Sequence, residues 1–338
     1  MMTSAPDPTV TTLHVRCGGD IREKLAEAGI EGAYLSFADP AWLGPPPAFN
    51  AWIAGRAALI AERTGIARAK VREELGDSYW QIARAPQRYS HIVLWFEHDL
   101  YDQSALARIL AGFALRKTRP KIELIAIDRF PGVKRFFGLG QLSAAQLASL
   151  WPQRKAVSRR QLVAGSAAWA ALRAPTPEPL MEIVAAGTPA LPLMKPALQR
   201  QLQELPWTTD GLSLTEREAL RALAKGPLAA SDVFGAAQLQ RDPQPFMGDL
   251  FFFAVLRDLL DSPHPPIAVS PATRRAVWPR RVLRLTPVGR AVLGGKLDWQ
   301  SQFPLERWVG GIPISHGDPP WRWNPRTKKA VKNEVVSG

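Results

Sequence analysis

The chain has 338 residues, which is long for one domain and enough for two domains that each bury a core. Its single cysteine, Cys17, excludes an intramolecular disulfide, and five scattered histidines provide no zinc-type spacing. The first dozen residues lack the basic start and apolar run of an export signal, and no stretch is apolar enough to span a membrane. We therefore expect a cytoplasmic protein with no membrane partner.

The formal net charge is +13, and most of the excess lies near the C-terminus. Residues 270–338 contain 13 Lys and Arg against 4 Asp and Glu, whereas residues 1–150 contain 18 against 15. Such a distribution indicates an anionic partner, either nucleic acid or phosphate, or else a well-solvated basic surface.

The first predicted elements have a strand, helix, strand order. LHVRC (13–17) and GAYLSF (32–37) are β-prone, and IREKLAEAG (21–29) between them is helical. Asp20 and Glu23 have the spacing of a capping box, which predicts that this helix begins directly after Asp20 and carries Glu23 in its first turn.

An α/β domain is predicted for residues 10–130. Helical periodicity over 49–84 predicts one or two crossover helices, and the apolar run HIVLWF (91–96) is the strongest strand signal. A helix over 104–117 and the strand KIELIAI (121–127) follow. Near-continuous apolar strands that alternate with helices predict a mostly parallel, Rossmann-like sheet covered on both faces.

The remaining sequence predicts three further parts. Prolines divide residues 131–210 into short helices that form an extension and connector, and the turn-forming segment 206–212 marks a boundary. We expect proteases to cut first near residues 206–211 or in the C-terminal tail. Residues 211–300 predict three helices followed by a β-hairpin, which is the order of a winged helix. Residues 301–338 form a basic tail rich in Trp and Arg, which would either stack on bases or bury its indoles against the body.

The third predicted helix of the winged helix, residues 246–261, is mainly apolar, which favours burial over base readout. Its basic side chains lie instead on and around the predicted hairpin. They would contact phosphate without reading the sequence, unless the module serves only for packing. These nucleic-acid-binding candidates are Arg274, Arg275, Arg280, Arg281 and Arg284.

Acidic or glycine-rich turns follow every predicted strand of the N-terminal domain. In an open parallel sheet, ligands bind outside the carboxyl ends of the strands, so these turns are expected to converge. The catalytic candidates are Glu97, His98 and Asp99; the ligand-binding candidates are Gly18, Gly19, Asp20, Asp39, Arg56, Asp102 and Gln103; and the metal-ligating candidates are Asp39, Asp99 and Asp128.

Carboxylates gathered in a cleft either share protons or bind a hard cation, for which Mg²⁺ is the expected cofactor. His98 would act there as acid or base. Gly18 and Gly19 leave amide groups open to an anion, although Asp20 would repel a phosphate unless a metal intervened. Alternatively, these acidic residues only cap helices and fix turns. Phe137 to Gly140, FGLG, is interpreted as a turn, and Cys17 as a buried small side chain.

Several motifs resemble those of a known family. They are LHVRCGGD near the start, the Asp39-Pro40 turn with Gly44-Pro45, IVLWFEHDLYDQ, FFGLGQLSAAQLASLWPQR, LTEREALRALAKG, LTPVGRAVLGG and RWVGG. On these motifs the chain resembles the bacterial family known as domain of unknown function number eighteen thirty-five. The resemblance covers nearly the whole chain, and WFEHDLYDQ is its most specific motif. It implies the fold and boundaries and assigns no catalytic residue.

Two functions therefore stay open. The first is a phospho-ligand or nucleotide-handling α/β domain, for example a metal-dependent hydrolase or transferase, fused to a winged helix. The second is a non-enzymatic nucleic-acid-binding regulator that uses the basic C-terminal domain. The sequence specifies neither the substrate nor the oligomeric state.

Overall fold

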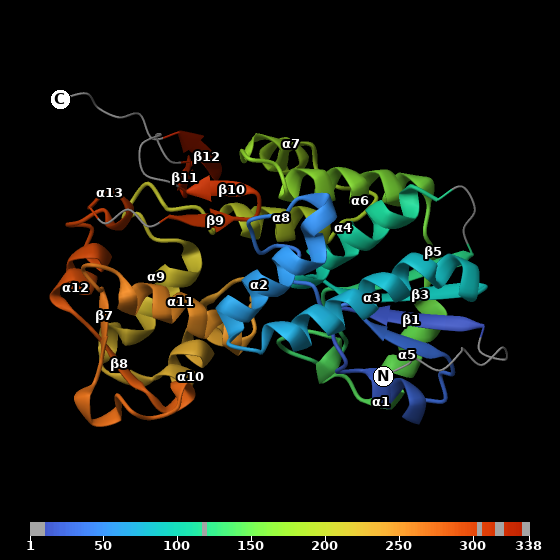
Figure 1. Cartoon of the computed structure of the whole chain (residues 1–338), viewed down its shortest axis with the longest axis horizontal. Coiled ribbons are helices and arrows are strands. Elements are labelled where there is room, and N and C mark those ends of the chain that lie inside the picture. Colours follow the sequence, from blue (N-terminus) through green and yellow to red (C-terminus); the bar gives the residue numbers. More distant parts are fainter. Residues whose placement is uncertain (1–10, 117–119, 303–305, 315–320, 333–338) are drawn as a thin grey trace.

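The computed structural model describes residues 11–116, 120–302, 306–314 and 321–332. The expectations for the first ten residues and for parts of the basic tail lie outside these ranges. An α/β part with the labelled strands β1, β3 and β5 lies at one end of the long axis, and a mainly helical part with β7 and β8 lies at the other (Figure 1). No helix of the described residues is long and apolar enough to cross a membrane.

The main sheet has the strand order β2-β1-β3-β4-β5. Its first four strands in chain order are parallel, and the short β5 pairs with β4 in the antiparallel direction. The predicted mostly parallel sheet is confirmed. The strands are β1 (Thr12–Arg16), β2 (Ala33–Ser36), β3 (His91–Glu97), β4 (Lys121–Ile127) and β5 (Lys155–Ala156).

The strand order places a topological switch point between β1 and β3. From β1 the chain first adds β2 on one side and then crosses over to add β3 on the other. In sheets of this kind the crevice outside the carboxyl ends of the two strands at the switch point is the usual ligand site. The fold therefore marks one place on the sheet before any side chain is considered.

Both faces of the sheet are buried, which explains the continuous apolar run of β3. Val93 and Trp95 point to the core under α1 and α5, whereas Leu94 and Phe96 point to the core under α4, α6 and α8. The helices of this part are α1 (Arg22–Glu27), α2 (Trp52–Thr64), α3 (Arg68–Arg88), α4 (Leu100–Ala114), α5 (Ala144–Leu150), α6 (Arg159–Leu172), α7 (Glu178–Ala186) and α8 (Met194–Leu202).

Two predicted helix starts were wrong. The N-cap of α1 is Ile21 and no side chain caps it, because the Asp20 carboxylate pairs with Arg16 instead. The helix predicted from residue 104 begins at Leu100, because Asp99 caps it there by accepting a hydrogen bond from the Asp102 amide. Both differences arise at the acidic turns: an ion pair takes the Asp20 carboxylate away from its helix, whereas Asp99 caps the next helix earlier than predicted.

The C-terminal part has its own core, which includes Leu220, Phe252, Leu256, Ile267 and Leu283. Three helical segments precede two paired strands, and a short third strand completes an antiparallel sheet of order β6-β8-β7. The third helix starts three residues later than predicted. The elements are α9 (Leu214–Ala222), β6 (Leu228–Ala229), α10 (Ala230–Phe234) with a π-helical continuation (Gly235–Arg241), α11 (Asp249–Asp261), β7 (Ile267–Val269), β8 (Val282–Leu285), α12 (Pro287–Leu293) and α13 (Trp299–Gln302).

The chain then returns to the α/β part as two hairpins. Val309, Ile312, Ile314 and Trp323 join the same core as β3 and α4. The expected burial of the tail indoles is confirmed for Trp323, whereas Trp308 is 44% exposed. The strands are β9 (Arg307–Val309), β10 (Ile312–Ile314), β11 (Trp321–Asn324) and β12 (Lys329–Lys332).

Candidate functional site

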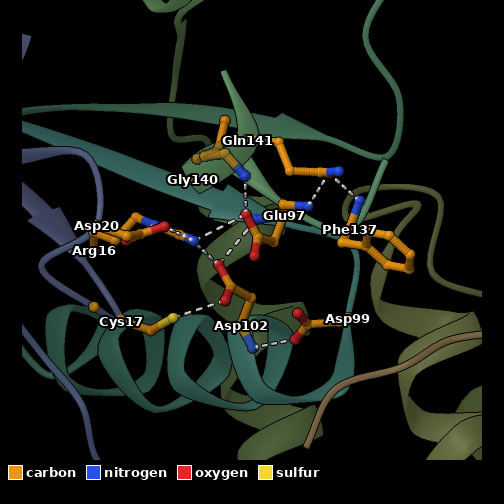
Figure 2. A network of polar contacts seen from close by, with 12 residues as sticks. Arg16, Cys17, Asp20, Glu97, Asp99, Asp102, Phe137, Gly140 and Gln141 are labelled. Atoms are coloured by element: carbon orange, nitrogen blue, oxygen red, sulfur yellow. Dashed lines mark hydrogen bonds and ion pairs between the residues drawn. The ribbon is translucent and has the colours of Figure 1, made fainter. Parts of the chain in front are cut away.

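A buried polar network occupies the switch point. Arg16 ends β1, Glu97 ends β3, and Asp99 and Asp102 belong to the first turn of α4. Their side chains point toward one another in Figure 2, together with Cys17 and Asp20 from the turn after β1. Because β1 and β3 are parallel neighbours, their carboxyl ends bring these distant parts of the sequence together. The predicted convergence of strand-end carboxylates is therefore seen for Asp20, Glu97, Asp99 and Asp102.

Asp102 uses both of its carboxylate oxygens in the network. Its Oδ1 accepts from Arg16 Nη1 at 2.6 Å and from the backbone amide of Glu97 at 3.0 Å. Its Oδ2 accepts from the thiol of Cys17 at 2.7 Å. Both oxygens are thus held by donors of this chain, which fixes the orientation of the carboxylate.

Glu97 and Asp99 are engaged on one oxygen each. Glu97 Oε2 lies 2.9 Å from Arg16 Nη2 and accepts from the backbone amide of Leu139. Asp99 Oδ1 accepts from the Asp102 amide at 2.8 Å. Among the described residues no hydrogen bond uses Glu97 Oε1 or Asp99 Oδ2, so one oxygen of each carboxylate stays available to a ligand.

The loop that presents these carboxylates is fixed from behind. Gln103 is buried and its Nε2 donates to the carbonyl of Glu97 at 2.6 Å. Gln244, from the C-terminal part, donates to the carbonyl of His98 at the same distance. Gln103, a predicted ligand-binding residue, thus holds the backbone of the site and leaves ligand contacts to its neighbours.

The charges in this network do not balance. Burial and repulsion by Asp102 raise the pKa of Glu97 to about 8, and the same causes raise the pKa of Asp99 well above its usual value. Burial lowers the pKa of Arg16, but the combined attraction of Asp102, Glu97 and the other neighbouring acidic groups raises it above its usual value, so the guanidinium stays charged. One guanidinium therefore faces three buried carboxyl groups, which at neutral pH take up either protons or a cation.

Cys17 does not supply a nucleophile. Burial and the neighbouring Asp102 raise the pKa of its thiol well above the ordinary value. The thiol form is the one that donates to Asp102, and only a thiolate is strongly nucleophilic. The expectation of an unreactive side chain agrees with this arrangement, although the sulfur belongs to the polar network and not to an apolar core.

The carboxyl groups of Glu97, Asp99 and Asp102 fit a hard cation. One oxygen of each lies within 4.8 Å of the others, and within the described ranges this is the one such group of three. Mg²⁺ and Mn²⁺ prefer carboxylate oxygens as ligands. The set differs from the predicted one, because Glu97 and Asp102 stand in place of Asp39 and Asp128, and only Asp99 is common to both.

Asp39 and Arg56 form a separate buried pair. Asp39 Oδ1 accepts from Arg56 Nε at 2.9 Å and from Arg56 Nη2 at 2.6 Å, while Oδ2 accepts from the Tyr79 hydroxyl at 2.6 Å. This carboxylate is fully used to join the turn after β2 to α2 and α3. The predicted roles of Asp39 as a metal ligand and of Arg56 as a source of positive charge for the crevice are therefore corrected.

His98 and Asp128 lie beside the carboxylate cluster and are not among its members. His98 is half-buried near the Phe136 ring, burial lowers its pKa, and nearby Asp128 opposes that shift. Asp128 is largely exposed and pairs with Arg129. The set of Asp39, Asp99 and Asp128 is therefore not assembled as one metal site.

A glycine loop that the sequence interpretation treated as a turn covers the cluster. The Leu139 amide donates to Glu97, and a Cβ at Gly138 would lie 2.2 Å from Glu97 Oε1. A Cβ at Gly140 would lie 2.5 Å from Asp20 Oδ2. The two glycines therefore permit the loop to contact the carboxylates. The G-x-G spacing was the only feature of the sequence that indicated this contact. The predicted Gly18 and Gly19 flank Asp20, and Gly19 is exposed.

Arg16 is the main residue that the sequence interpretation missed. Its guanidinium bonds to Asp20 at 3.0 Å through both Nε and Nη2, in addition to its contacts with Glu97 and Asp102. It is 4% exposed. The available signal was an arginine inside an otherwise apolar strand that ends at two glycines.

The basic residues of the C-terminal part lie far along the chain from this cluster, on the β7–β8 connection and β8. Arg281 stacks on Trp278 at 4.8 Å, and within the described residues none of the five predicted arginines forms an ion pair. Arg274, Arg275, Arg280 and Arg284 are exposed.

Comparison of the chain with protein-family models and with curated proteins found no match. The resemblance to the bacterial family named above therefore stays a prediction, and the function is argued from the site.

Proposed function

We propose that Glu97, Asp99 and Asp102 form a divalent-cation site and that this site serves metal-dependent chemistry on a phosphorylated ligand, as in a hydrolase or transferase. One observation supports the proposal above the others: three buried carboxyl groups converge at the switch point of the sheet opposite a single guanidinium. A structural cluster would be expected to balance its charges internally, because unpaired buried charge is costly.

A cation is also the feature that would allow an anionic ligand to approach. Phosphate is repelled by carboxylates, and a bound Mg²⁺ would neutralise them and offer phosphate oxygens a direct ligand. Arg16 would keep Asp102 and Glu97 in place, and Asp99 would contribute its free oxygen. The glycine loop at residues 138–140 would exclude water once the site is loaded.

Thermal shift with Mg²⁺ or Mn²⁺ and a nucleotide panel tests this proposal. We expect the wild type to be stabilised by the cation, and further by a phosphorylated ligand, because ligands that bind the folded state raise its stability. Asp99→Asn is the informative variant, since asparagine also caps helices and so preserves the start of α4. No shift with any pair, or equal shifts in the variant, would contradict the proposal.

We further propose, as a second candidate function, that residues 211–300 form a winged helix that binds nucleic acid through its basic hairpin. Its support is the helix and strand order of this part and the exposed arginines without ion pairs on the β7–β8 connection. Since α11 is packed into the core through Phe252 and Leu256, binding would use phosphate contacts and tolerate different sequences.

Electrophoretic shifts at two salt concentrations test the second candidate. Replacing Arg280, Arg281 and Arg284 with alanine should weaken binding of every sequence alike and reduce the salt slope by roughly one unit per lost phosphate contact. Wild-type protein that fails to bind at low salt would leave this part as a packing module.

A further inference from the structure

A basic groove lies at the end of the sheet opposite the carboxylate cluster. It has a volume of about 650 Å³ and is lined by Trp80, Ala83, Arg84, Gln87, Arg88 and Arg116. These residues come from the last turns of α3 and from the residues after α4, which precede the amino ends of β3 and β4. β3 has seven residues and is therefore about 20 Å long, and the cluster lies at its carboxyl end.

An indole lies at the centre of the groove with two guanidiniums against it. Trp80 is 41% exposed, and the guanidinium carbons of Arg84 and Arg88 lie 4.4 and 5.3 Å from its ring centroid. The three residues are spaced four apart, so they lie along one face of α3. Cation–π attraction keeps both guanidiniums beside the ring without using their hydrogen-bond donors.

The groove has donors and no carboxylate. None of its lining residues is acidic, and within the described parts of the chain neither Arg84 nor Arg88 forms an ion pair. Arg116 Nη2 donates to the carbonyl of Ala83 at 2.9 Å, which holds the third guanidinium against α3. Guanidiniums that converge in this way suit phosphate oxygens, which they bind in bidentate geometry.

We propose that this groove binds a nucleoside phosphate, either as a free nucleotide or as a unit of a single-stranded nucleic acid. The base would stack on the exposed part of Trp80 and the phosphate would bind Arg84 and Arg88, which is how single strands and nucleotides are held without base-specific contacts. The groove volume lies within the range of small-ligand sites. This site is independent of the proposed cation site and needs no metal.

The test measures binding of two fluorescent probes in EDTA, so that cation-dependent binding at the carboxylate cluster does not contribute. The probes are a labelled twelve-residue oligothymidylate and N-methylanthraniloyl-ADP. We expect the double variant Arg84→Gln, Arg88→Gln to bind each probe with at least tenfold lower affinity. The matched control is Arg68→Gln with Arg72→Gln, because these arginines are exposed, four apart and on the same helix, and it should retain affinity within twofold.

The Trp80→Leu variant separates base stacking from charge. The variant should bind both nucleoside probes more weakly. Its affinity for inorganic tripolyphosphate, measured as competitor, should stay unchanged, since tripolyphosphate has no base to stack. If the oligonucleotide binds more tightly at equal salt, the natural ligand is a single-stranded nucleic acid. If the nucleotide binds more tightly, the natural ligand is a free nucleotide. Absence of wild-type binding at low salt, an equal loss in the Arg68 and Arg72 control, or full affinity in Trp80→Leu would overturn the proposal.

Discussion

The residues of WFEHDLYDQ serve several structural purposes. Trp95 and Phe96 are buried on opposite faces of the sheet, and Leu100 joins the core of the C-terminal part. Glu97 and Asp102 bind Arg16. The sequence could predict that these carboxylates end a strand and gather. It could not predict Arg16 as their counter-ion, because a lone arginine in a short strand is more simply interpreted as exposed.

Glu97 should make stability depend on pH. Its pKa rises from 4.5 unfolded to about 8 folded, so between these values the folded state retains a proton that the unfolded state has lost. Raising the pH from 5.5 to 8 in EDTA should therefore destabilise the wild type, by at most about 1.4 kcal/mol per pH unit from this group. Urea unfolding of the wild type and of Glu97→Gln at both pH values measures this change in the free energy of unfolding.

The variant lacks this titrating carboxyl group and should lose less stability over the same range. Glu73→Gln, an exposed side chain on α3, controls for removal of one carboxylate elsewhere. A wild-type stability that rises between pH 5.5 and 8, or an identical pH dependence in Glu97→Gln, would contradict the charge imbalance described for the site.

Arg16 should be the most sensitive single position in the network. Arg16→Met removes the buried counter-ion of Asp102 and Glu97, and breaking one partner of a buried pair costs about 3–5 kcal/mol. Chemical denaturation in EDTA measures the loss, and added Mn²⁺ should restore part of it by supplying positive charge. A loss below about 1 kcal/mol would mean that the carboxyl groups are neutral without Arg16.

At the scale of elements, the periodicity of the apolar strands was sufficient to predict the parallel sheet. The position of the 138–140 loop was not predictable, because a single G-x-G is common in turns and its partner Glu97 is about 40 residues away in sequence. Likewise, capping-box spacing at Asp20 gave a wrong helix start because Arg16 competes for the same carboxylate. The capping-box rule failed here because the carboxylate that would cap the helix forms an ion pair with a residue of the preceding strand.

Gly138→Ala tests the close approach of this loop. The new methyl group would lie 2.2 Å from Glu97 Oε1, so the loop or the carboxylate must move, at a cost of about 1–3 kcal/mol. Gly19→Ala, also beside the cluster, is the matched control, because nothing lies within 4 Å of its Cβ position. Thermal denaturation should give a lower melting temperature for Gly138→Ala than for Gly19→Ala. Equal melting temperatures would rule out the close contact between the loop and Glu97.

At the scale of the whole molecule, the C-terminal tail pairs with the segment that leads from the α/β part to the C-terminal part. The segment predicted as an exposed boundary, 206–212, is paired instead: the Thr208 amide donates to the Trp323 carbonyl, and the Trp323 amide donates to the Pro206 carbonyl. Composition indicated turn formers at this position correctly. It could not indicate the β11 partner, which lies more than a hundred residues later in the chain.

Proteolysis should follow this pairing. The structure predicts that the 206–212 segment resists cleavage in the wild type. In a chain that ends at residue 302 the same segment should be cut first, because that chain lacks β11 and the buried Trp323. Mass spectrometry of limited digests identifies the first cut. Early cleavage between residues 206 and 212 in the intact chain would contradict the described docking of the tail.

The central claim is that Glu97, Asp99 and Asp102 bind a divalent cation, and electron paramagnetic resonance of Mn²⁺ tests it most directly. Titration of the wild type should reveal one tightly bound Mn²⁺ per chain that Mg²⁺ displaces. Asp99→Asn should lose this binding while its near-ultraviolet circular dichroism stays native, and Asp77→Asn, an exposed change on α3, should retain it. Unbound Mn²⁺ in the wild type, or equal binding by Asp99→Asn, would show that protons and Arg16 alone balance the cluster.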